Sequence, residues 1–331
     1  MWFENLVGFN EITPEQVRAN LRIEGDQLIS IANSKSYTYG KLEVLSLAEL
    51  KDRAKSLDAY QAKIQFSEVV GNIQVFHRNP LNEGAFFQAA SQFNLLEMVG
   101  PYVTPEEGVD IYETDFTQGP ACAIACGAGT IYRNYFAPVN NQIGQSANNQ
   151  IYCLKDLGTF LGNKDGALWE MSNGYAFASE KGLENISQQI KALSVTEYEQ
   201  LKAKLRIGLQ WNTEVTISEN KHLVTQAYCS ALPVGYSDHS TDLWEDFARL
   251  VLNASYEATF YAALLNYEQT GNNNNYLTLV GGGVFGNKPE WIFDAIESAI
   301  LKFSKTPLNL KFVSYGNSNQ KLKTFLESIK H

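Results

Sequence analysis

The most regular hydrophobic pattern in the chain lies in its C-terminal third. Apolar residues recur at three- and four-residue spacing from Trp244 to Leu265, which places them on one face of a long helix. A second run with the same spacing extends from Trp291 to Phe303, just after Pro289, and proline is favoured in the first turn of a helix. Both runs predict helices that pack one face against a core.

Shorter apolar stretches, separated by turn-forming residues, predict strands. From position 82 onward they alternate with predicted helices, an order that favours a largely parallel sheet because each parallel connection needs a crossover. We therefore predict an α/β fold, a three-layer α/β/α arrangement whose mixed sheet is covered on both faces. The predicted strands cover 85–90, 167–171, 207–211, 224–229, 276–280 and 310–315, and further helices cover 47–57, 121–136, 184–193 and 195–205.

The first part of the chain has a different pattern. Short alternating stretches at 28–31, 41–45 and 63–66 are typical of antiparallel strands. We expect residues 1–76 to form an N-terminal extension that packs on the main domain, 77–331, and covers or extends its sheet.

Charge and hydropathy narrow the classes of partner. With 26 basic and 36 acidic residues the net charge is −10, whereas nucleic-acid affinity depends on clustered Lys and Arg. No stretch approaches the roughly 18 apolar residues of a membrane helix, and the start lacks the pattern of a secretory signal. We expect neither a nucleic-acid nor a membrane partner, and a cytoplasmic location, or the host cytoplasm if the source is a pathogen.

Cysteine and histidine give little support for a metal centre. Cys122 and Cys126 are four residues apart and could pair or bind a metal, but the Ala and Gly around them favour small residues that pack a helix. The four His form no HxxxH or HxH pattern. We predict no metal site and no required cofactor.

The strongest chemical motif is the glycine turn Gly281-Gly282-Gly283-Val284-Phe285-Gly286, which lies between a predicted strand and a predicted helix with Asn287 as its N-cap. Successive glycines allow positive φ and let backbone N–H groups converge on an anion at a helix N-terminus. The turn lacks the Lys-Ser/Thr of a P-loop and the GxGxxG spacing of a dinucleotide fold. Read alone, it is equally a turn that only reverses the chain.

The segment from Val280 to Asn287 resembles the second phosphate-binding loop of macrodomains and of microbial poly(ADP-ribose) glycohydrolases. The long helix before it and the final strand ending at Gly316 resemble the last third of that fold. The resemblance implies a macrodomain-like pocket for ADP-ribose. In it Gly281, Gly282, Gly283, Val284, Phe285, Gly286 and Asn287 would hold the pyrophosphate, and Phe285 would be the best placed aromatic contact, ahead of Phe116, Tyr132 and Tyr315.

The upstream half resembles the family more loosely. Ala89-Ala90-Ser91-Gln92-Phe93-Asn94 stands where macrodomains close a central strand, so Asn94 would face the distal ribose and Gln92 would lie beside it. Thr117-Gln118-Gly119-Pro120 stands at the turn into the first helix, but it has neither the triple glycine nor the Gln-Glu-Glu of the glycohydrolases. These segments look closest to the divergent macrodomains that include the Legionella effector MavL, which removes ADP-ribose from arginine of ubiquitin.

The long loop between Asn94 and Gln118 contains six acids. An ADP-ribosyl hydrolase needs a carboxylate near the anomeric carbon of the distal ribose. Glu97 follows the strand end and Asp115 precedes the helix, so both are candidate catalytic groups, and Glu107 and Asp110 could converge with them. The alternative is that these acids are solvated loop charges.

The expected function is therefore an ADP-ribosylhydrolase that releases ADP-ribose from a modified protein, through an N- or O-glycosidic bond. The resemblance implies ADP-ribose as ligand or product, with arginine-linked ubiquitin as one substrate. A non-catalytic module that reads ADP-ribosylated proteins would use the same phosphate loop and is the alternative.

Overall fold

A mixed seven-stranded sheet forms the centre of the protein in the computed structural model, which describes residues 1–330. Its strands are β4 (Lys41–Ser46), β5 (Gln65–Val70), β6 (Phe86–Ala90), β11 (Arg206–Glu214), β12 (Leu223–Cys229), β13 (Asn274–Leu277) and β14 (Asn309–Ser314). They lie in the order β4-β11-β12-β6-β13-β14-β5. The pairs from β12 to β5 are parallel, and β11 is antiparallel to both neighbours.

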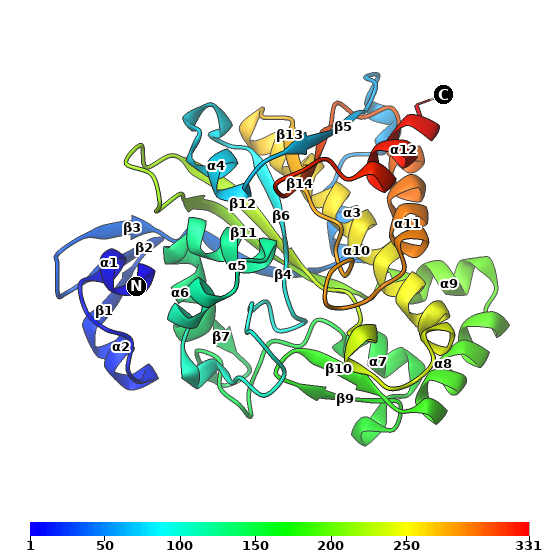
Figure 1. Cartoon of the computed structure of the whole chain (residues 1–331), viewed down its shortest axis with the longest axis horizontal. Coiled ribbons are helices and arrows are strands. Elements are labelled where there is room, and N and C mark those ends of the chain that lie inside the picture. Colours follow the sequence, from blue (N-terminus) through cyan, green and yellow to red (C-terminus); the bar gives the residue numbers. More distant parts are fainter. Residues whose placement is uncertain (331) are drawn as a thin grey trace.

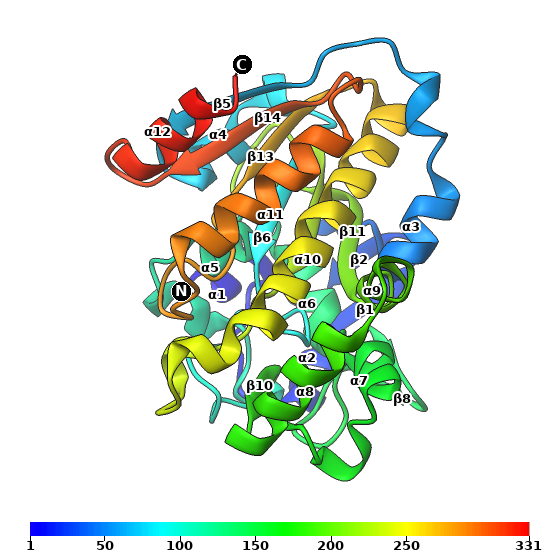
Figure 2. The same cartoon turned by 90° about the vertical axis from the view of Figure 1, so that its right-hand side faces the viewer.

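Helices cover both faces of this sheet, as the predicted α/β/α arrangement requires. In Figure 2, α10 and α11 lie in front of the sheet and α5 and α6 behind it. The first face carries α3 (Leu47–Arg53), α8 (Glu180–Ala192), α9 (Val195–Lys202), α10 (Thr241–Thr270) and α11 (Pro289–Lys302); the second carries α4 (Ile73–Arg78), α5 (Gln118–Ala125) and α6 (Gly127–Tyr135). The chain ends with α12 (Gln320–Ser328), which contacts β5.

The remaining elements lie at the margins of the sheet (Figure 1). Near the N-terminus, α1 (Trp2–Val7), α2 (Pro14–Asn20), β1 (Leu21–Glu24), β2 (Gln27–Ser30) and β3 (Ser36–Thr38) form a small subdomain. The middle of the chain adds β7 (Pro138–Val139), β8 (Gln142–Ile143), α7 (Lys155–Leu161), β9 (Trp169–Ser172) and β10 (Tyr175–Ala178). Single 3₁₀ turns include η3 (Pro105–Glu107) and η4 (Asp110–Thr114) in the acidic loop.

The two predicted amphipathic helices have the expected cores. In α10 the apolar face from Trp244 to Leu265 is buried, and Gly271 ends the helix in the left-handed conformation with φ 75°. In α11 the residues from Trp291 to Ile300 that repeat at helical spacing are buried. Because these helices pack against each other and α10 contacts β6, β11 and β12, they form the main core.

Three expectations differ from the structure. The helix expected over 121–136 is two helices that meet at Cys126, where φ is −120° and ψ 59°; the break lets the chain pass close to Trp2, whose ring would lie 2.6 Å from a β-carbon at Gly127. The strand expected at 167–171 is β9, which pairs with β10 in a hairpin outside the main sheet. The strand near 63–66 is β5, which is parallel to β14.

The predicted boundary at residue 76 passes through the sheet, because β4 and β5 are its two edge strands. Residues 1–76 therefore extend the sheet, and only the subdomain up to β3 packs beside it. That subdomain shares a second hydrophobic core, which includes Phe3 and Leu28, with the acidic loop and α6.

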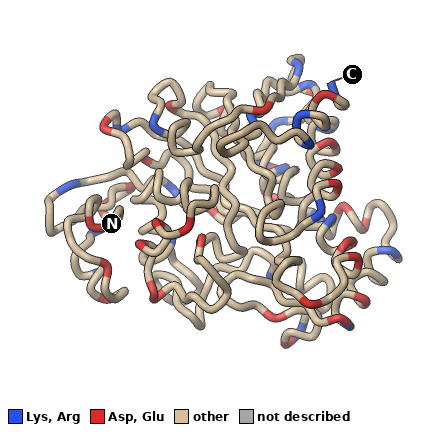
Figure 3. The backbone as a smooth tube through the Cα atoms, viewed as in Figure 1, with Lys and Arg blue, Asp and Glu red and all other residues tan. Residues whose placement is uncertain are grey.

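Charge is spread over the molecule. Figure 3 shows acidic residues along the whole backbone, so the net charge of −10 is not concentrated at one place. Among the helices within residues 1–330, none is long and apolar enough to cross a membrane.

Candidate functional site

A cavity of about 380 Å³ opens where β6 and β13 end. The two strands are adjacent and parallel, so their carboxyl ends meet at one edge of the sheet. In open α/β sheets this edge is where ligands usually bind. Its walls come from Ala90 and the residues after it, the start of α5, the segment after β13, and Tyr175 of β10.

The glycine turn forms one wall. Gly281 and Gly286 have φ of 78° and 69°, the left-handed region that favours glycine. Gly281, Gly283, Val284 and Phe285 line the cavity, whereas Gly282 and Gly286 lie behind them. The glycines thus allow the chain to fold sharply at the mouth of the cavity.

Three consecutive amides of the turn are free. The amides of Gly282, Gly286 and Asn287 donate to carbonyls within the turn at 3.0 Å each. Within residues 1–330 those of Gly283, Val284 and Phe285 make no hydrogen bond to the protein. Successive free N–H groups in a lining turn are the arrangement that binds an anion.

Asn287 has a different place from the one expected. The N-cap of α11 is Lys288, with Pro289 as the first helical residue, so the predicted capping role of Asn287 is wrong. Its side-chain nitrogen Nδ2 instead donates to the backbone carbonyls of Leu232 at 2.8 Å and Gly281 at 3.3 Å. The side chain is short and is already engaged with these carbonyls, so it does not cap the helix that begins two residues later. Asn287 stabilises the turn and does not line the cavity.

An aromatic cluster faces the turn. The ring of Phe285 lies 5.3 Å from that of Tyr175 and 5.7 Å from that of Tyr236, and all three line the cavity. Two weaker candidates, Phe116 and Tyr315, are largely exposed, and Tyr132 stacks on Tyr39 at 3.9 Å. The sequence did not indicate Tyr175 and Tyr236, because both lie far along the chain from the glycine turn and from the segments 89–94 and 117–120.

The wall opposite the turn is the start of α5. Gln118 joins this helix to β6, because its side chain accepts from the Ala90 amide at 3.1 Å and donates to the Gln88 carbonyl at 2.7 Å. The helix begins at Gln118, three residues before the predicted start at 121, and Thr117 lines the cavity beside it. Gln118 also lines the cavity, but its amide group is already paired.

Gln92 and Asn94 belong to the turn that follows β6. Gln92 lines the cavity. Its side chain accepts from the backbone amide of Met98 at 2.9 Å and donates to the Met98 carbonyl at 3.3 Å. Asn94 is fully buried and does not line the cavity. It bonds the Gln150 side chain at 2.9 Å and the Leu96 amide at 3.1 Å, so both residues shape the turn.

The four predicted acids separate into two pairs. Glu97 and Asp115 line the cavity, and Asp115 accepts from the Thr117 amide at 2.8 Å. Glu107 belongs to a capping box with Thr104, and Asp110 accepts from the Phe3 amide at 3.2 Å. Neither Glu107 nor Asp110 lines the cavity, because η3 and η4 turn these side chains toward the loop itself and the N-terminal segment.

Glu97 is the buried acid of the site. Its side chain is 1 % exposed, and neither carboxyl oxygen has a hydrogen-bond partner within residues 1–330. Burial raises the pKa of Glu97 to about 8, against the opposing charge of Arg133. A carboxyl that holds a proton near neutral pH, in a cavity, is a common property of functional sites.

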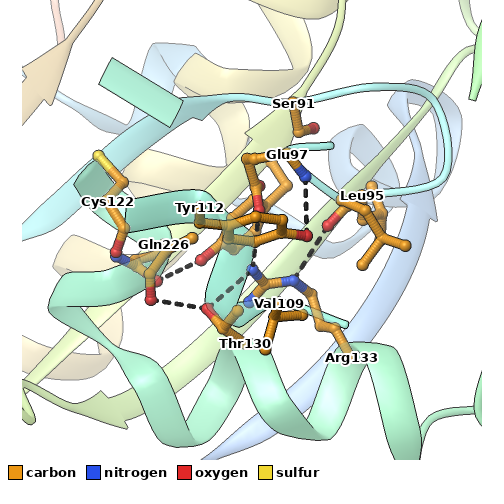
Figure 4. Close-up of polar contacts among 12 residues, drawn as sticks. Ser91, Leu95, Glu97, Val109, Tyr112, Cys122, Thr130, Arg133 and Gln226 are labelled. Atoms are coloured by element: carbon orange, nitrogen blue, oxygen red, sulfur yellow. Dashed lines mark hydrogen bonds and ion pairs between the residues drawn. The ribbon is translucent and has the colours of Figure 1, made fainter. Parts of the chain in front are cut away.

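Arg133 and Tyr112 lie around Glu97 (Figure 4). The Tyr112 hydroxyl accepts from the Glu97 amide at 3.0 Å, and the Arg133 Nη2 lies 3.6 Å from the Glu97 Oε2. Arginine is mostly exposed in proteins, whereas Arg133 is fully buried. Its only sequence signal is its place on the buried face of a helix of small residues.

Within the described residues 1–330, no group of three or more His, Cys, Asp and Glu side chains could hold a metal ion. Cys122 and Cys126 are free and buried, as are Cys153 and Cys229. Cys122 and Cys126 thus pack inside the protein, the role that their small neighbours favoured.

Comparisons with known proteins give structural likenesses alone. No protein-family model matches the chain, and no curated protein matches it. The poly(ADP-ribose) glycohydrolase of Thermomonospora curvata bound to the inhibitor ADP-HPD is 10% identical, with a TM-score of 0.46 over 94% of this chain and 93% of that one. The enzyme of Deinococcus radiodurans in complex with ADP-ribose is 10% identical, with a TM-score of 0.46 over 87% and 95%.

Proposed function

We propose that the cavity binds ADP-ribose. The observation that carries the proposal is that three free amides, at Gly283, Val284 and Phe285, share one cavity with Glu97, whose carboxyl accepts no hydrogen bond within residues 1–330. Amides in such a turn suit a pyrophosphate, and the aromatic cluster suits a flat base or a sugar face. A carboxyl whose oxygens accept no hydrogen bond from the protein suits sugar hydroxyls or a leaving group. The resemblance of the glycine turn to macrodomain loops supports the same ligand.

We propose further that the protein hydrolyses the bond between ADP-ribose and a protein side chain. In this reaction the anomeric carbon loses its bond to the side-chain atom and gains one to the oxygen of water, while one proton of that water ends on the leaving atom. Glu97, protonated below about pH 8, can donate its proton to the leaving atom as a general acid and regain a proton from the attacking water. Asp115, at the same cavity, can orient the water or the ribose. No cofactor takes part.

The finer substrate proposal is an arginine-linked ADP-ribose, with ubiquitin as one modified protein. Its support is the likeness of the segments 89–94 and 117–120 to the divergent macrodomains described above. Purified substrates linked through arginine, serine or glutamate separate the possibilities, because one enzyme seldom cleaves an N-glycoside and an ester through the same leaving-group contacts.

Calorimetric titration with ADP-ribose tests the binding proposal. Gly283→Val is the sharpest variant, because position 283 lines the cavity and nothing lies within 4 Å of an added β-carbon. The fold should therefore tolerate the valine, while the side chain occupies space beside the free amides. We expect Kd to rise about tenfold or more, equivalent to about 1.4 kcal/mol. Wild-type protein that does not bind ADP-ribose would refute the proposal.

Turnover by Glu97→Gln tests the chemistry. Glutamine has the shape of the protonated acid but cannot donate its proton, so we expect turnover to fall by about 100-fold or more while ADP-ribose binding is kept. Tight binding with no turnover of any linkage by the wild-type protein would instead identify a reader of ADP-ribosylated proteins.

A further inference from the structure

Arg133 is a fully buried cation beside the cavity, although it does not line it. Its guanidinium lies 3.6 Å from the centre of the Tyr228 ring. The Nε donates to the Leu95 carbonyl at 3.1 Å, and the Nη2 donates to the Thr130 hydroxyl at 3.2 Å. Figure 4 shows the side chain reaching from α6 toward Leu95 and Glu97. Arg133 thus links its own helix and Tyr228 of β12 to the turn that carries Glu97.

That turn has an unusual backbone. Leu95 has a φ of 66°, a left-handed conformation that a residue with a branched side chain adopts only where its surroundings enforce it. Its amide donates to the Gln92 carbonyl at 2.9 Å, and its carbonyl accepts from Arg133. The Leu95 side chain fills the space above Gly208, where a β-carbon would lie 2.3 Å away. The turn is therefore held at its amide, its side chain and its carbonyl.

Glu97 depends on this turn for its place in the cavity. It follows Leu95 by two residues, and its amide donates to the Tyr112 hydroxyl. If the bond from Arg133 to Leu95 were lost, the strained residue could relax and the carboxyl would move. Backbone strain held in place by a buried side chain is a recurring feature of functional sites.

Arg133 also supplies the charge that acts on the Glu97 carboxyl. The titratable groups facing Glu97 are Arg133 on α6, Tyr112 on η4, Cys122 on α5 and Tyr228 on β12. Burial raises the pKa of Tyr112, Cys122 and Tyr228 well above their usual ranges, so all three are neutral. Of these groups only Arg133 is charged. Its positive charge favours the ionised form of Glu97 and so opposes the effect of burial on the pKa of Glu97.

We propose that Arg133 is the positioning residue of the cavity: it fixes the turn that presents Glu97, and it holds a positive charge 3.6 Å from the Glu97 carboxyl. This inference rests on the proposed function only in assigning Glu97 a part in catalysis. The placement and titration of Glu97 can be measured without any substrate, so the two proposals fail separately.

The first test is the titration of the Glu97 carboxyl in the ligand-free protein, followed by carbon-13 NMR of labelled glutamate. The Glu97→Gln variant identifies the signal, because that signal alone disappears. In Arg133→Met the cation is gone while most of the volume remains, and we expect the midpoint to rise by about one pH unit or more. Arg133→Lys keeps the charge without the planar fork, so its midpoint should stay nearer the wild-type value.

The matched control is Arg249→Met, which removes an arginine paired with Glu245 and Asp294 at the surface of α10. It should leave the Glu97 midpoint unchanged. A midpoint in Arg133→Met equal to that of the wild type would overturn the electrostatic part of the proposal. If Arg133→Met does not fold, the lysine variant decides the geometric part: amide hydrogen exchange at Leu95 and Glu97 should rise, and unchanged exchange there would overturn it.

With an active enzyme, the kinetic result is specific as well. Because Arg133 does not touch the cavity, Arg133→Lys should lower kcat and leave KM nearly unchanged, whereas Gly283→Val should raise KM. In Arg133→Met the pH profile should move to higher pH with the NMR midpoint. A profile that stays in place while the midpoint moves would show that Glu97 does not act in the chemistry, and would refute the proposed function without touching the role of Arg133 in the fold.

Discussion

At the scale of single residues, the burial of Glu97 ties stability to pH. A glutamate in an unfolded chain has an ordinary pKa of 4.5, whereas burial raises the pKa of Glu97 in the folded protein to about 8. Between these values the folded state holds a proton that the unfolded state has lost. Its contribution to stability is therefore complete below about pH 4.5 and declines as the pH rises toward 8.

The prediction concerns Glu97→Gln. Glutamine is neutral at every pH, so the free energy of unfolding of the variant relative to wild type should increase between pH 5 and pH 8, by up to about 1.4 kcal/mol per pH unit. Urea denaturation of both proteins at the two pH values measures this difference, since the other acids contribute equally and cancel. A difference that stays constant would mean that Glu97 is ionised throughout the range.

Residues near the motifs were predictable, and residues that act through them were not. Glu97 and Asp115 were chosen because one follows a strand end and the other precedes a helix, and both line the cavity. Arg133 gave no such signal, because arginine is mostly exposed in proteins and the Leu95 carbonyl that it bonds is 38 residues away in sequence. Tyr175 and Tyr236 were hidden for the same reason, since their approach to Phe285 depends on the tertiary fold.

At the scale of elements, the site depends on how closely α5 approaches β6. A β-carbon at Gly119 would lie 2.0 Å from the Ala90 carbonyl oxygen, so this glycine permits the contact. Gln118 then joins the two elements through the Ala90 amide and the Gln88 carbonyl. The glycine sets the distance, and the glutamine completes the backbone hydrogen bonding where β6 ends.

Gly119→Ala should therefore separate α5 from the end of β6. We expect a loss of about 1–3 kcal/mol in the free energy of unfolding, the range of overpacking in a well-packed core, together with weaker ADP-ribose binding. Gly283→Ala is the matched control, because the same added carbon meets nothing within 4 Å and should leave the unfolding temperature unchanged. Equal unfolding temperatures for the two variants would contradict the argument.

Ion pairs join α10 to both α9 and α11. Glu257 of α10 lies 2.9 Å from the Lys202 ammonium of α9 and also bonds Lys302 of α11. Glu257 and Lys202 are both nearly buried, so Glu257→Gln leaves a buried cation with only Glu199 as partner. We expect the free energy of unfolding, measured by thermal or urea denaturation, to fall by about 3 kcal/mol. Asp242→Asn, in the exposed pair with Lys288, should change little.

The elements themselves were largely predictable because periodicity is a local signal. The apolar faces of α10 and α11 and the buried β6 are evident in windows of a dozen residues. Strand partners are not local. The hairpin of β9 with β10 and the parallel pairing of β5 with β14 were misjudged, because a short alternating stretch has the same pattern in any sheet.

At the scale of the whole molecule, the N-terminal segment is tied to the wall of the cavity. Glu11 accepts from the Asp110 amide and from the Tyr135 hydroxyl, at 2.7 Å each, while Asp110 accepts from the Phe3 amide at 3.2 Å. These bonds fasten the loop that carries Tyr112, whose hydroxyl accepts from the Glu97 amide. Burial raises the pKa of the Glu11 carboxyl, against the hydrogen bonds from Asp110 and Tyr135.

The predicted consequence is that Glu11→Ala loosens the cavity from a distance. Two donors in partly buried hydrogen bonds lose their acceptor, at up to about 1–3 kcal/mol for each group left unpaired, so η4 should open more often. Hydrogen exchange in residues 109–115 should accelerate, and ADP-ribose affinity should fall although Glu11 does not line the cavity. The control is Glu15→Ala, which removes only an exposed pair with Arg18. If exchange in 109–115 matched that of the control, the loop would be held by its own 3₁₀ turns, and the N-terminal segment would have no part in the site.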